Sequence, residues 1–158
     1  MALEDLRKTR IEKLKLLQQN GINPYPTRSS FILTRISDIK KEFKRLLKTK
    51  KSFAIAGRIL AKREHGGSIF TDISDGEDKL QIFLAKDELG EKSFKLFTES
   101  MDIGDFVAGQ GKLFLTKKKE QTLAATKWEV LAKSLRPLPE KWHGLSDVEE
   151  RFRKRYLD

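Results

Sequence analysis

Residues 63–84 contain the side chains best suited to chemistry, because two alternating runs flank an acidic turn at 75–78 and predict a β-hairpin. Successive side chains of a strand point to opposite faces of a sheet. One face is expected to point into a core and contains Ile69, Thr71, Ile73, Leu80, Ile82 and Leu84. The other face takes Phe70, Asp72, Gln81 and Phe83. Rings that stack beside an amide that hydrogen-bonds predict a surface for a planar ligand; the alternative is that a neighbouring element covers the rings.

Few residues of the sequence are suited to catalysis or metal binding. The chain has no cysteine and two histidines, His65 and His143, so disulfides, thiolate metal sites and a zinc cluster are not expected. The sequence also has no phosphate-cradling glycine loop, no nucleophile with an adjacent base and no carboxylate cluster at metal spacing. Glu149 and Glu150 lie among arginines, which indicates an ion-paired helix surface. We therefore predict no catalytic residue, no metal and no cofactor in this chain.

The net charge of +10 is concentrated in the N-terminal third. Residues 1–51 contain 14 Lys and Arg against 5 Asp and Glu, whereas residues 52–133 contain 13 of each. A basic segment attracts polyanions, most often nucleic acid and less often an anionic membrane; a solvated face without a partner is the alternative. Lys8 and Lys15 are our candidates for phosphate contacts. No apolar run is long enough to span a membrane and no signal-peptide core is present, so we expect a cytoplasmic protein.

The order of helix and strand patterns predicts how these side chains are positioned. The expected elements are helices at 2–19, 38–48 and 86–99 and strands at 52–63, in the two arms of the hairpin, at 104–116 and at 120–132. Ser37 is the expected N-cap of the second helix, and Gly57 falls where a strand must bend. This is a mainly-β chain with flanking helices, in which five strands in the order β-β-β-α-β-β form an OB-fold barrel.

The barrel divides the chain into three expected parts. Residues 1–51 form a basic helical segment, residues 52–133 the barrel, and residues 134–158 a linker and a short helix. OB folds commonly bind oligonucleotides on the face of strands 2 and 3, where Phe70 and Gln81 are expected. A barrel without a nucleic-acid role is the alternative, since a fold does not determine a function.

The last segment contains the most specific pattern. Residues 135–158 read LRPLPEKWHGLSDVEERFRKRYLD, which resembles the linker between anticodon-binding barrel and catalytic domain in bacterial-type class II lysyl-tRNA synthetases. The resemblance extends to GINPYP at 21–26, AGRI at 56–59 and GKLF at 111–114. The chain ends at Asp158, where the catalytic domain of that family would begin. The resemblance therefore implies a fragment that lacks the catalytic core and is inactive alone.

The resemblance also implies roles for individual residues. In that family an aromatic residue of strand 2 stacks on the central anticodon base while an Arg and a Gln contact its edge, and the matching residues are Phe70, Arg63 and Gln81. A Glu after the turn between strands 4 and 5 contacts a flanking base and matches Glu120, although the glycine usual before it is Lys119 here. The implied ligand is the U-rich anticodon of a lysine tRNA. ATP and magnesium are implied for the parent enzyme only, a homodimer that attaches lysine to its tRNA.

Two other classes of function remain open from the sequence. The chain is then either a stand-alone protein that binds single-stranded nucleic acid without sequence preference, or an interaction module whose terminal helices mediate subunit contacts. Equal binding of poly-pyrimidine and of an anticodon loop would favour the first. A tight dimer without RNA affinity would favour the second.

Overall fold

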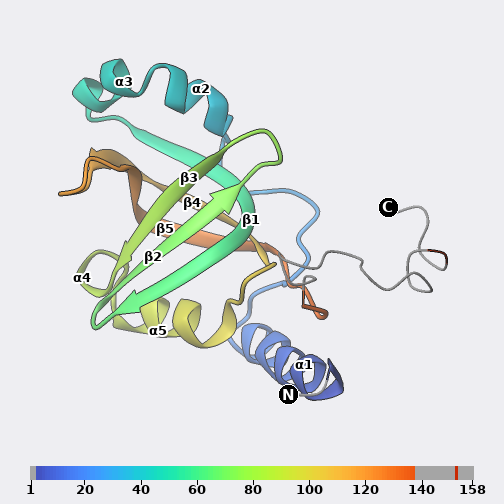
Figure 1. The fold of residues 1–158 in the computed structure, drawn as a ribbon. Coiled ribbons are helices and arrows are strands. Elements are labelled where there is room, and N and C mark those ends of the chain that lie inside the picture. The colour runs from blue at the N-terminus through green and yellow to red at the C-terminus, as the bar shows by residue number, and fades with distance from the viewer. Residues whose placement is uncertain (1–2, 138–151, 153–158) are drawn as a thin grey trace.

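Five strands close into a barrel with helices at both of its ends (Figure 1). The structure is a computed structural model that describes residues 3–137 and 152. The strands are β1 (Ser52–His65), β2 (Ser68–Ser74), β3 (Lys79–Ala85), β4 (Phe106–Leu115) and β5 (Gln121–Ala132). Their order around the barrel is β1-β2-β3-β5-β4, and only β3 and β5 run parallel among these pairs. The predicted OB-fold barrel, with helix between the third and fourth strands, is confirmed.

The helices follow the predicted order, but two of them are divided. They are α1 (Leu3–Gln19), α2 (Ile36–Lys41), α3 (Phe43–Thr49), α4 (Lys86–Leu89) and α5 (Glu91–Ser100). Gly90, with φ of 81°, separates α4 from α5, and Glu42 separates α2 from α3. No helix in the described ranges is long and apolar enough to cross a membrane. The short helix expected within 134–158 falls on residues that, apart from 134–137 and 152, are outside the described part.

The prediction that Ser37 caps the second helix is wrong. Helix α2 begins two residues earlier than predicted, at Ile36, and its N-cap residue Arg35 makes no side-chain cap hydrogen bond. Instead, the backbone N–H of Ile36 donates to Oδ2 of Asp75 at 3.0 Å. Asp75 belongs to the turn between β2 and β3, so this helix end is satisfied by a residue distant in the sequence.

The alternation predicted for the hairpin is confirmed along β2, and along β3 except at Gln81, which is buried. The six residues assigned to the core face are all buried: Ile69, Thr71, Ile73, Leu80, Ile82 and Leu84. On the opposite face Phe70, Asp72 and Phe83 are half-buried. The register of β2 and β3 places Phe70 directly opposite Phe83 and Asp72 opposite Gln81. The predicted ligand face is therefore a continuous surface of two adjacent strands.

A sharp bend in β1 allows one strand to serve both sides of the barrel. Its first half pairs with β4 and its second half with β2, and the change of partner occurs at Arg58. The preceding residue is Gly57, where a Cβ atom would lie 2.4 Å from the carbonyl oxygen of Ser74. Only glycine allows the two strands to approach this closely, and the register irregularity of β1 follows between Ile59 and Ala61.

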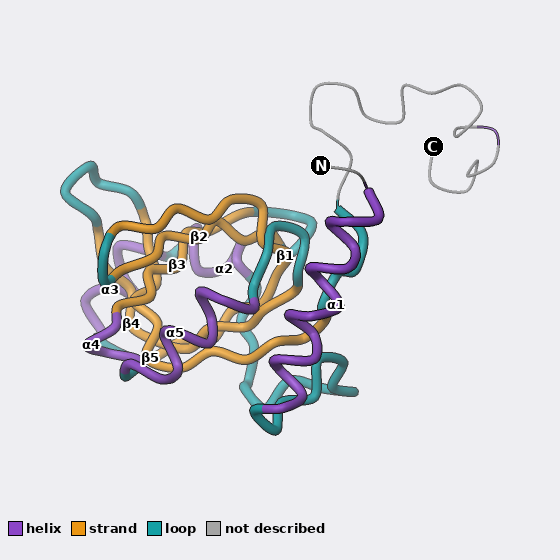
Figure 2. Tube along the Cα trace, turned by 90° about the horizontal axis from the view of Figure 1, so that it is seen from below, coloured by secondary structure: helices purple, strands orange, loops and turns teal. Residues whose placement is uncertain are grey.

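Helices cover the barrel at opposite ends (Figures 1 and 2). Helix α5 buries Phe94 and Phe97 against the lower end in Figure 1, while α2 and α3 bury Ile39 and Phe43 at the upper end. Helix α1 lies beside α5, where its Leu17 is fully buried. The face formed by β2 and β3 is left between these two layers of helix.

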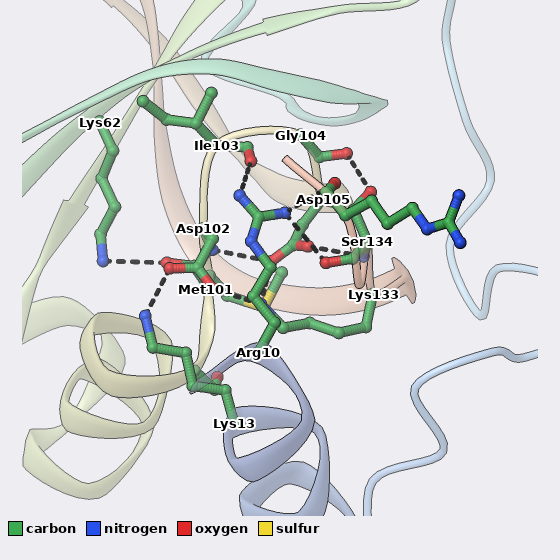
Figure 3. A network of polar contacts seen from close by, with 12 residues as sticks. Arg10, Lys13, Lys62, Met101, Asp102, Ile103, Gly104, Asp105, Lys133 and Ser134 are labelled. Atoms are coloured by element: carbon green, nitrogen blue, oxygen red, sulfur yellow. Dashed lines mark hydrogen bonds and ion pairs between the residues drawn. The ribbon is translucent and has the colours of Figure 1, made fainter. Parts of the chain in front are cut away.

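A buried ion cluster closes the end of the barrel near α1 (Figure 3). The Lys133 ammonium group, which is fully buried, lies 2.6 Å from Asp102 and 2.7 Å from Asp105, and the Asp105 side chain is also fully buried. Lys13 of α1 makes a second ion pair with Asp102. Burial of the Asp102 carboxyl opposes its ionisation, but hydrogen bonds from Lys13 and Lys133 outweigh this effect and hold its pKa below the ordinary value.

Arg10 fixes α1 to the segment that follows β5 (Figure 3). Its guanidinium group donates to the backbone oxygens of Ile103 and Ser134, each at 3.0 Å, and to that of Arg136 at 3.3 Å. Ser134 and Arg136 lie two and four residues after the end of β5, the last strand of the barrel. Helix α1 is therefore bound by its polar side chains to the place where the chain leaves the barrel.

Candidate nucleic-acid interface

An open cleft of about 920 Å³ lies on the barrel face made by β2, β3 and the hairpin between β4 and β5. The four residues predicted to bind an anticodon all line it: Arg63, Phe70, Gln81 and Glu120. They come from four different parts of the chain, namely the end of β1, β2, β3 and the turn before β5. The barrel thus brings together side chains that are up to 57 residues apart, from 63 to 120.

Three aromatic rings form a row along the cleft. The centroids of Phe70 and Phe83 are 4.8 Å apart, and those of Phe83 and Phe114 are 5.8 Å apart. All three rings are half-buried and line the cleft, so no part of the described chain covers them completely. Half-exposed rings in a groove form a platform on which unpaired bases stack. The cleft is therefore shaped for planar ligands.

Gln81 lies in the wall of the cleft but is only 9% exposed. The alternation of β3 predicts a wetter position for this residue. Its low exposure has a physical cause, because β3 pairs with β2 on one side and with β5 on the other. The amide oxygen of Gln81 accepts a hydrogen bond of 2.9 Å from the hydroxyl of Thr122 on β5. The carboxamide is therefore held by the barrel and does not move freely at its surface.

Arg63 is held over the cleft by an acid from the neighbouring strand. Its two terminal nitrogens lie 3.1 and 3.3 Å from the two carboxylate oxygens of Asp72, so the pair is bidentate. Half of the Arg63 side chain remains exposed, at 50%. The register places Arg63 opposite Phe70. Asp72 lies two residues further along β2, on the same face as Phe70. Asp72 therefore orients the guanidinium group while leaving part of it free for a ligand.

The turn that presents Glu120 has the backbone geometry that glycine normally provides. Lys119 has φ of 62°, in the left-handed region, and its N–H donates to the carbonyl oxygen of Thr116 at 2.8 Å. The N–H of Thr116 in turn donates to the carbonyl oxygen of Glu120 at 3.1 Å. This pattern corresponds to a type I turn followed by a bulge residue. Replacement of the usual glycine by Lys119 has therefore preserved the turn, and Glu120 is exposed beside the cleft.

Exposed lysines surround the cleft. Lys79, Lys117 and Lys118 all line it, and none of them makes an ion pair with another described residue. Lys40 of α2 also reaches the rim, where it lies 2.5 Å from Asp78 and lowers the pKa of that carboxyl below its ordinary value. Ammonium groups without an ion-pair partner attract the phosphates of a nucleic acid, and an aromatic groove between them takes the bases of a single strand.

The two phosphate-contact candidates of α1 lie apart from this cleft. Lys8 and Lys15 are exposed, but α1 packs beside α5, at the end of the barrel away from α2 (Figures 1 and 2). Two other cations of α1, Arg10 and Lys13, turn toward the barrel and contact the segment at 102–105. Their charges are used within the fold.

Sequence reasoning did not identify two residues that shape the cleft. Phe114 extends the row of rings, and Thr122 holds Gln81; the register of β4 and β5 places these two residues opposite each other. Position 114 alternates with the buried Leu113, which was the available signal for a cleft-facing ring. For Thr122 no local signal exists, because its contact depends on the parallel pairing of β3 with β5.

The side chains that line the cleft are suited to ligand binding. Among them, no group of three or more His, Asp or Glu side chains is placed to hold a metal ion. The cleft contains one histidine, His65, and no serine or cysteine that faces it. Its chemistry is stacking, hydrogen bonding and charge attraction, which are the components of nucleic-acid recognition.

Known proteins match the chain along its whole length. Residues 53–131 match the family described as OB-fold nucleic acid binding domain. The lysine--tRNA ligase of Carboxydothermus hydrogenoformans is 47% identical over 156 residues, which are 99% of this chain and 31% of that protein. The lysine--tRNA ligases of Dehalococcoides mccartyi and Moorella thermoacetica are 42% and 44% identical, over 100% and 99% of this chain and 32% and 31% of their own length.

The chain thus spans about a third of the length of these relatives. The family match covers half of the chain and coincides with the barrel, from the second residue of β1 to the penultimate residue of β5. The chain belongs to the family of OB-fold nucleic acid binding domains, and along its whole length it matches the N-terminal region of lysine--tRNA ligases.

Proposed function

We propose that this chain is the anticodon-binding part of a lysine--tRNA ligase and that its cleft binds the U-rich anticodon of a lysine tRNA. The observation that carries this proposal is the convergence of Arg63, Phe70, Gln81 and Glu120 on one cleft with a row of aromatic rings. The similarity to lysine--tRNA ligases supports the choice of RNA.

Stacking is the first element of the proposed recognition. Phe70 takes the central anticodon base on its exposed side, while Phe83 supports the ring from the adjacent strand at 4.8 Å. Stacking of a base on an aromatic side chain contributes about 1–3 kcal/mol and does not discriminate strongly among bases. Stacking therefore supplies affinity, and the polar groups must supply the choice of base.

Hydrogen bonding to the base edge is the second element. Uracil presents an N3–H donor between two carbonyl oxygens, and the carboxamide of Gln81 has both complementary groups. Arg63, oriented by Asp72, donates to a carbonyl oxygen of the same base. Glu120 accepts the N3 proton of a flanking uracil. The exposed Lys117 and Lys118 contact the phosphates of the bound loop.

Aminoacylation is proposed for the parent enzyme and not for this chain alone. The described residues do not fit ATP with magnesium, since they contain no carboxylate group arranged for a metal. We place the binding of ATP, magnesium and lysine in the additional length of the relatives, of which this chain spans about a third. The parent is proposed to be a cytoplasmic homodimer.

The test is binding of the full 158-residue chain to two anticodon stem-loops, one with U and one with C as the central base. We expect the wild-type chain to prefer the U form and Gln81→Ala to lose about 1–3 kcal/mol on that form selectively. Gln110→Ala, on β4 outside the cleft, is the matched control and should leave both affinities unchanged. Equal affinity of the wild-type chain for both stem-loops and for poly-pyrimidine would instead favour a stand-alone single-strand-binding protein.

A further inference from the structure

Thr122 contacts the proposed base-reading amide from the neighbouring strand β5. Its side chain is fully buried, and its hydroxyl lies 2.9 Å from Oε1 of Gln81. The two residues are paired in the parallel register of β3 and β5, as the first pair at the cleft end of that ladder. Thr122 does not line the cleft, so any effect it has on a ligand must act through Gln81.

The hydroxyl of Thr122 has a single hydrogen and two acceptors within reach. One acceptor is Oε1 of Gln81 at 2.9 Å, and the other is the backbone oxygen of Glu120 at 3.2 Å. If the hydrogen goes to Gln81, the amide is fixed with its oxygen toward Thr122. If it went to Glu120, the amide would rotate and donate its own N–H to the hydroxyl oxygen. The direction of the threonine hydrogen and the orientation of the amide are therefore coupled.

With the amide oxygen of Gln81 held by Thr122, the amide nitrogen is left available on the cleft side. Nε2 donates to no group in the described part of the chain. It is not fully buried either, because the buried side-chain polar atoms without a partner there are Oγ1 of Thr71 and Oε1 of Gln121. The nitrogen is therefore accessible, and the surface available to it is the cleft that Gln81 lines. The amide oxygen has a second lone pair, which remains available to a ligand donor.

We propose that Thr122 is a positioning residue for base specificity, because it fixes the Gln81 amide in the orientation that matches uracil and opposes cytosine. This inference rests on the proposed function. With Nε2 toward the cleft, the amide donates to O4 of uracil and accepts from its N3–H. Cytosine presents an amino donor in place of O4, so two donors would face each other. The rotated amide would have the opposite preference.

The chain supplies a matched control for the test. Thr71 on β2 is also fully buried, and its hydroxyl has no hydrogen-bond partner within the described part of the chain. Thr71→Val and Thr122→Val therefore remove the same atom from two buried strand positions, and valine keeps the shape and the strand preference of threonine. Thr122→Ser retains the hydroxyl and is the rescue variant.

The experiment measures the affinity of each variant for the stem-loops with central U and central C. Thr122→Val should lower the ratio of U to C affinity by about fivefold to tenfold, which corresponds to one hydrogen bond, whereas Thr122→Ser should stay within about twofold of wild type. Thr71→Val should leave the ratio unchanged. In a Gln81→Ala background Thr122→Val should have no further effect on the ratio, because both changes act on one amide.

Two results would overturn the inference while leaving the proposed function intact. The first is that the wild-type chain prefers the U stem-loop and that the Thr122→Val variant has the same ratio of U to C affinity. The second is that Thr122→Val lowers the ratio of U to C affinity equally in the wild-type and in the Gln81→Ala background. Thr122 would then affect binding by a route that does not include Gln81. A wild-type chain with no preference for U would instead contradict the proposed function itself, and the inference with it.

Discussion

Two regions of this barrel, the end beside α1 and the cleft face, use polar side chains in opposite ways. Beside α1, Lys133 and Asp105 are fully buried and satisfy each other, and Asp102 binds two lysines. At the cleft, Arg63 has one partner and is half exposed, and Lys118 has no ion-pair partner among the described residues. The first set of charges has been used to build the fold, and the second set is available to a ligand.

This difference shows why the charge distribution along a sequence does not locate a binding surface. The N-terminal third holds most of the net positive charge, yet Arg10 and Lys13 within it contact the loop at 102–105. The barrel segment is neutral overall, yet it places free lysines around the cleft. What matters for RNA is which cations lack an internal partner, and that depends on tertiary contacts.

The largest expected effect is the loss of the buried cation. Lys133→Met leaves the carboxylates of Asp102 and Asp105 without their shared partner, and we expect the free energy of unfolding to fall by about 3–5 kcal/mol. Urea denaturation measures this loss. Lys118→Met, at the exposed rim of the cleft, is the control and should change stability by no more than about 0.5 kcal/mol. A loss below about 1 kcal/mol for Lys133→Met would contradict the structural role of the cluster.

The next effect separates binding from stability at the cleft. Phe70→Ala should weaken binding of the lysine anticodon stem-loop by about 1–3 kcal/mol, because it removes the stacking platform. Phe106→Ala is a matched control, since Phe106 is also half-buried in a strand but packs against Arg58 away from the cleft. Fluorescence titration of both variants gives the comparison. Equal losses of RNA affinity would show that Phe70 acts only through folding.

A smaller effect compares two pairs of exposed lysines. Reversing the charges of Lys117 and Lys118 should flatten the dependence of log affinity on log salt by up to about 0.7 per lost contact with single-stranded RNA. Reversing Lys8 and Lys15 should lower affinity for any RNA with a smaller change in slope, because α1 lies apart from the cleft. Titrations at several salt concentrations measure both slopes. An unchanged slope for the second pair would remove α1 from the RNA-binding surface.

The smallest effect concerns the backbone of the turn before Glu120. Lys119 has φ of 62°, a conformation that glycine adopts without strain, so Lys119→Gly should raise the free energy of unfolding by less than about 1 kcal/mol. Lys118→Gly, next to it but without positive φ, should lower the free energy instead. Thermal unfolding of the two variants measures the difference. A destabilised Lys119→Gly variant would contradict the turn geometry described above.

The sequence predicted those features whose causes are local. Alternation along β2 and β3 placed Phe70 on the cleft face and Ile69 in the core, and Gly57 marked the place where β1 approaches Ser74 closely. Features that depend on distant pairing could not be predicted. The contact of Lys133 with Asp102 spans 31 residues, and the capping of α2 by Asp75 spans 39.

The same limit applies within the cleft. Its four predicted residues were identified through a resemblance to a family, and the structure places them together. The hydrogen bond between Gln81 and Thr122 was not predicted, because it requires the parallel pairing that closes the barrel. Which edge of the amide faces the cleft is therefore a property of the closed barrel and not of either strand alone.

The most direct test of the contrast between these two regions is a titration of the isotope-labelled chain with the lysine anticodon stem-loop, followed by amide NMR shifts. The account predicts the largest shifts at the cleft, at Phe70, Gln81 and Phe114, with little change at Asp102 and Asp105. Largest shifts in α1 and at 102–105, with the cleft amides unchanged, would contradict it.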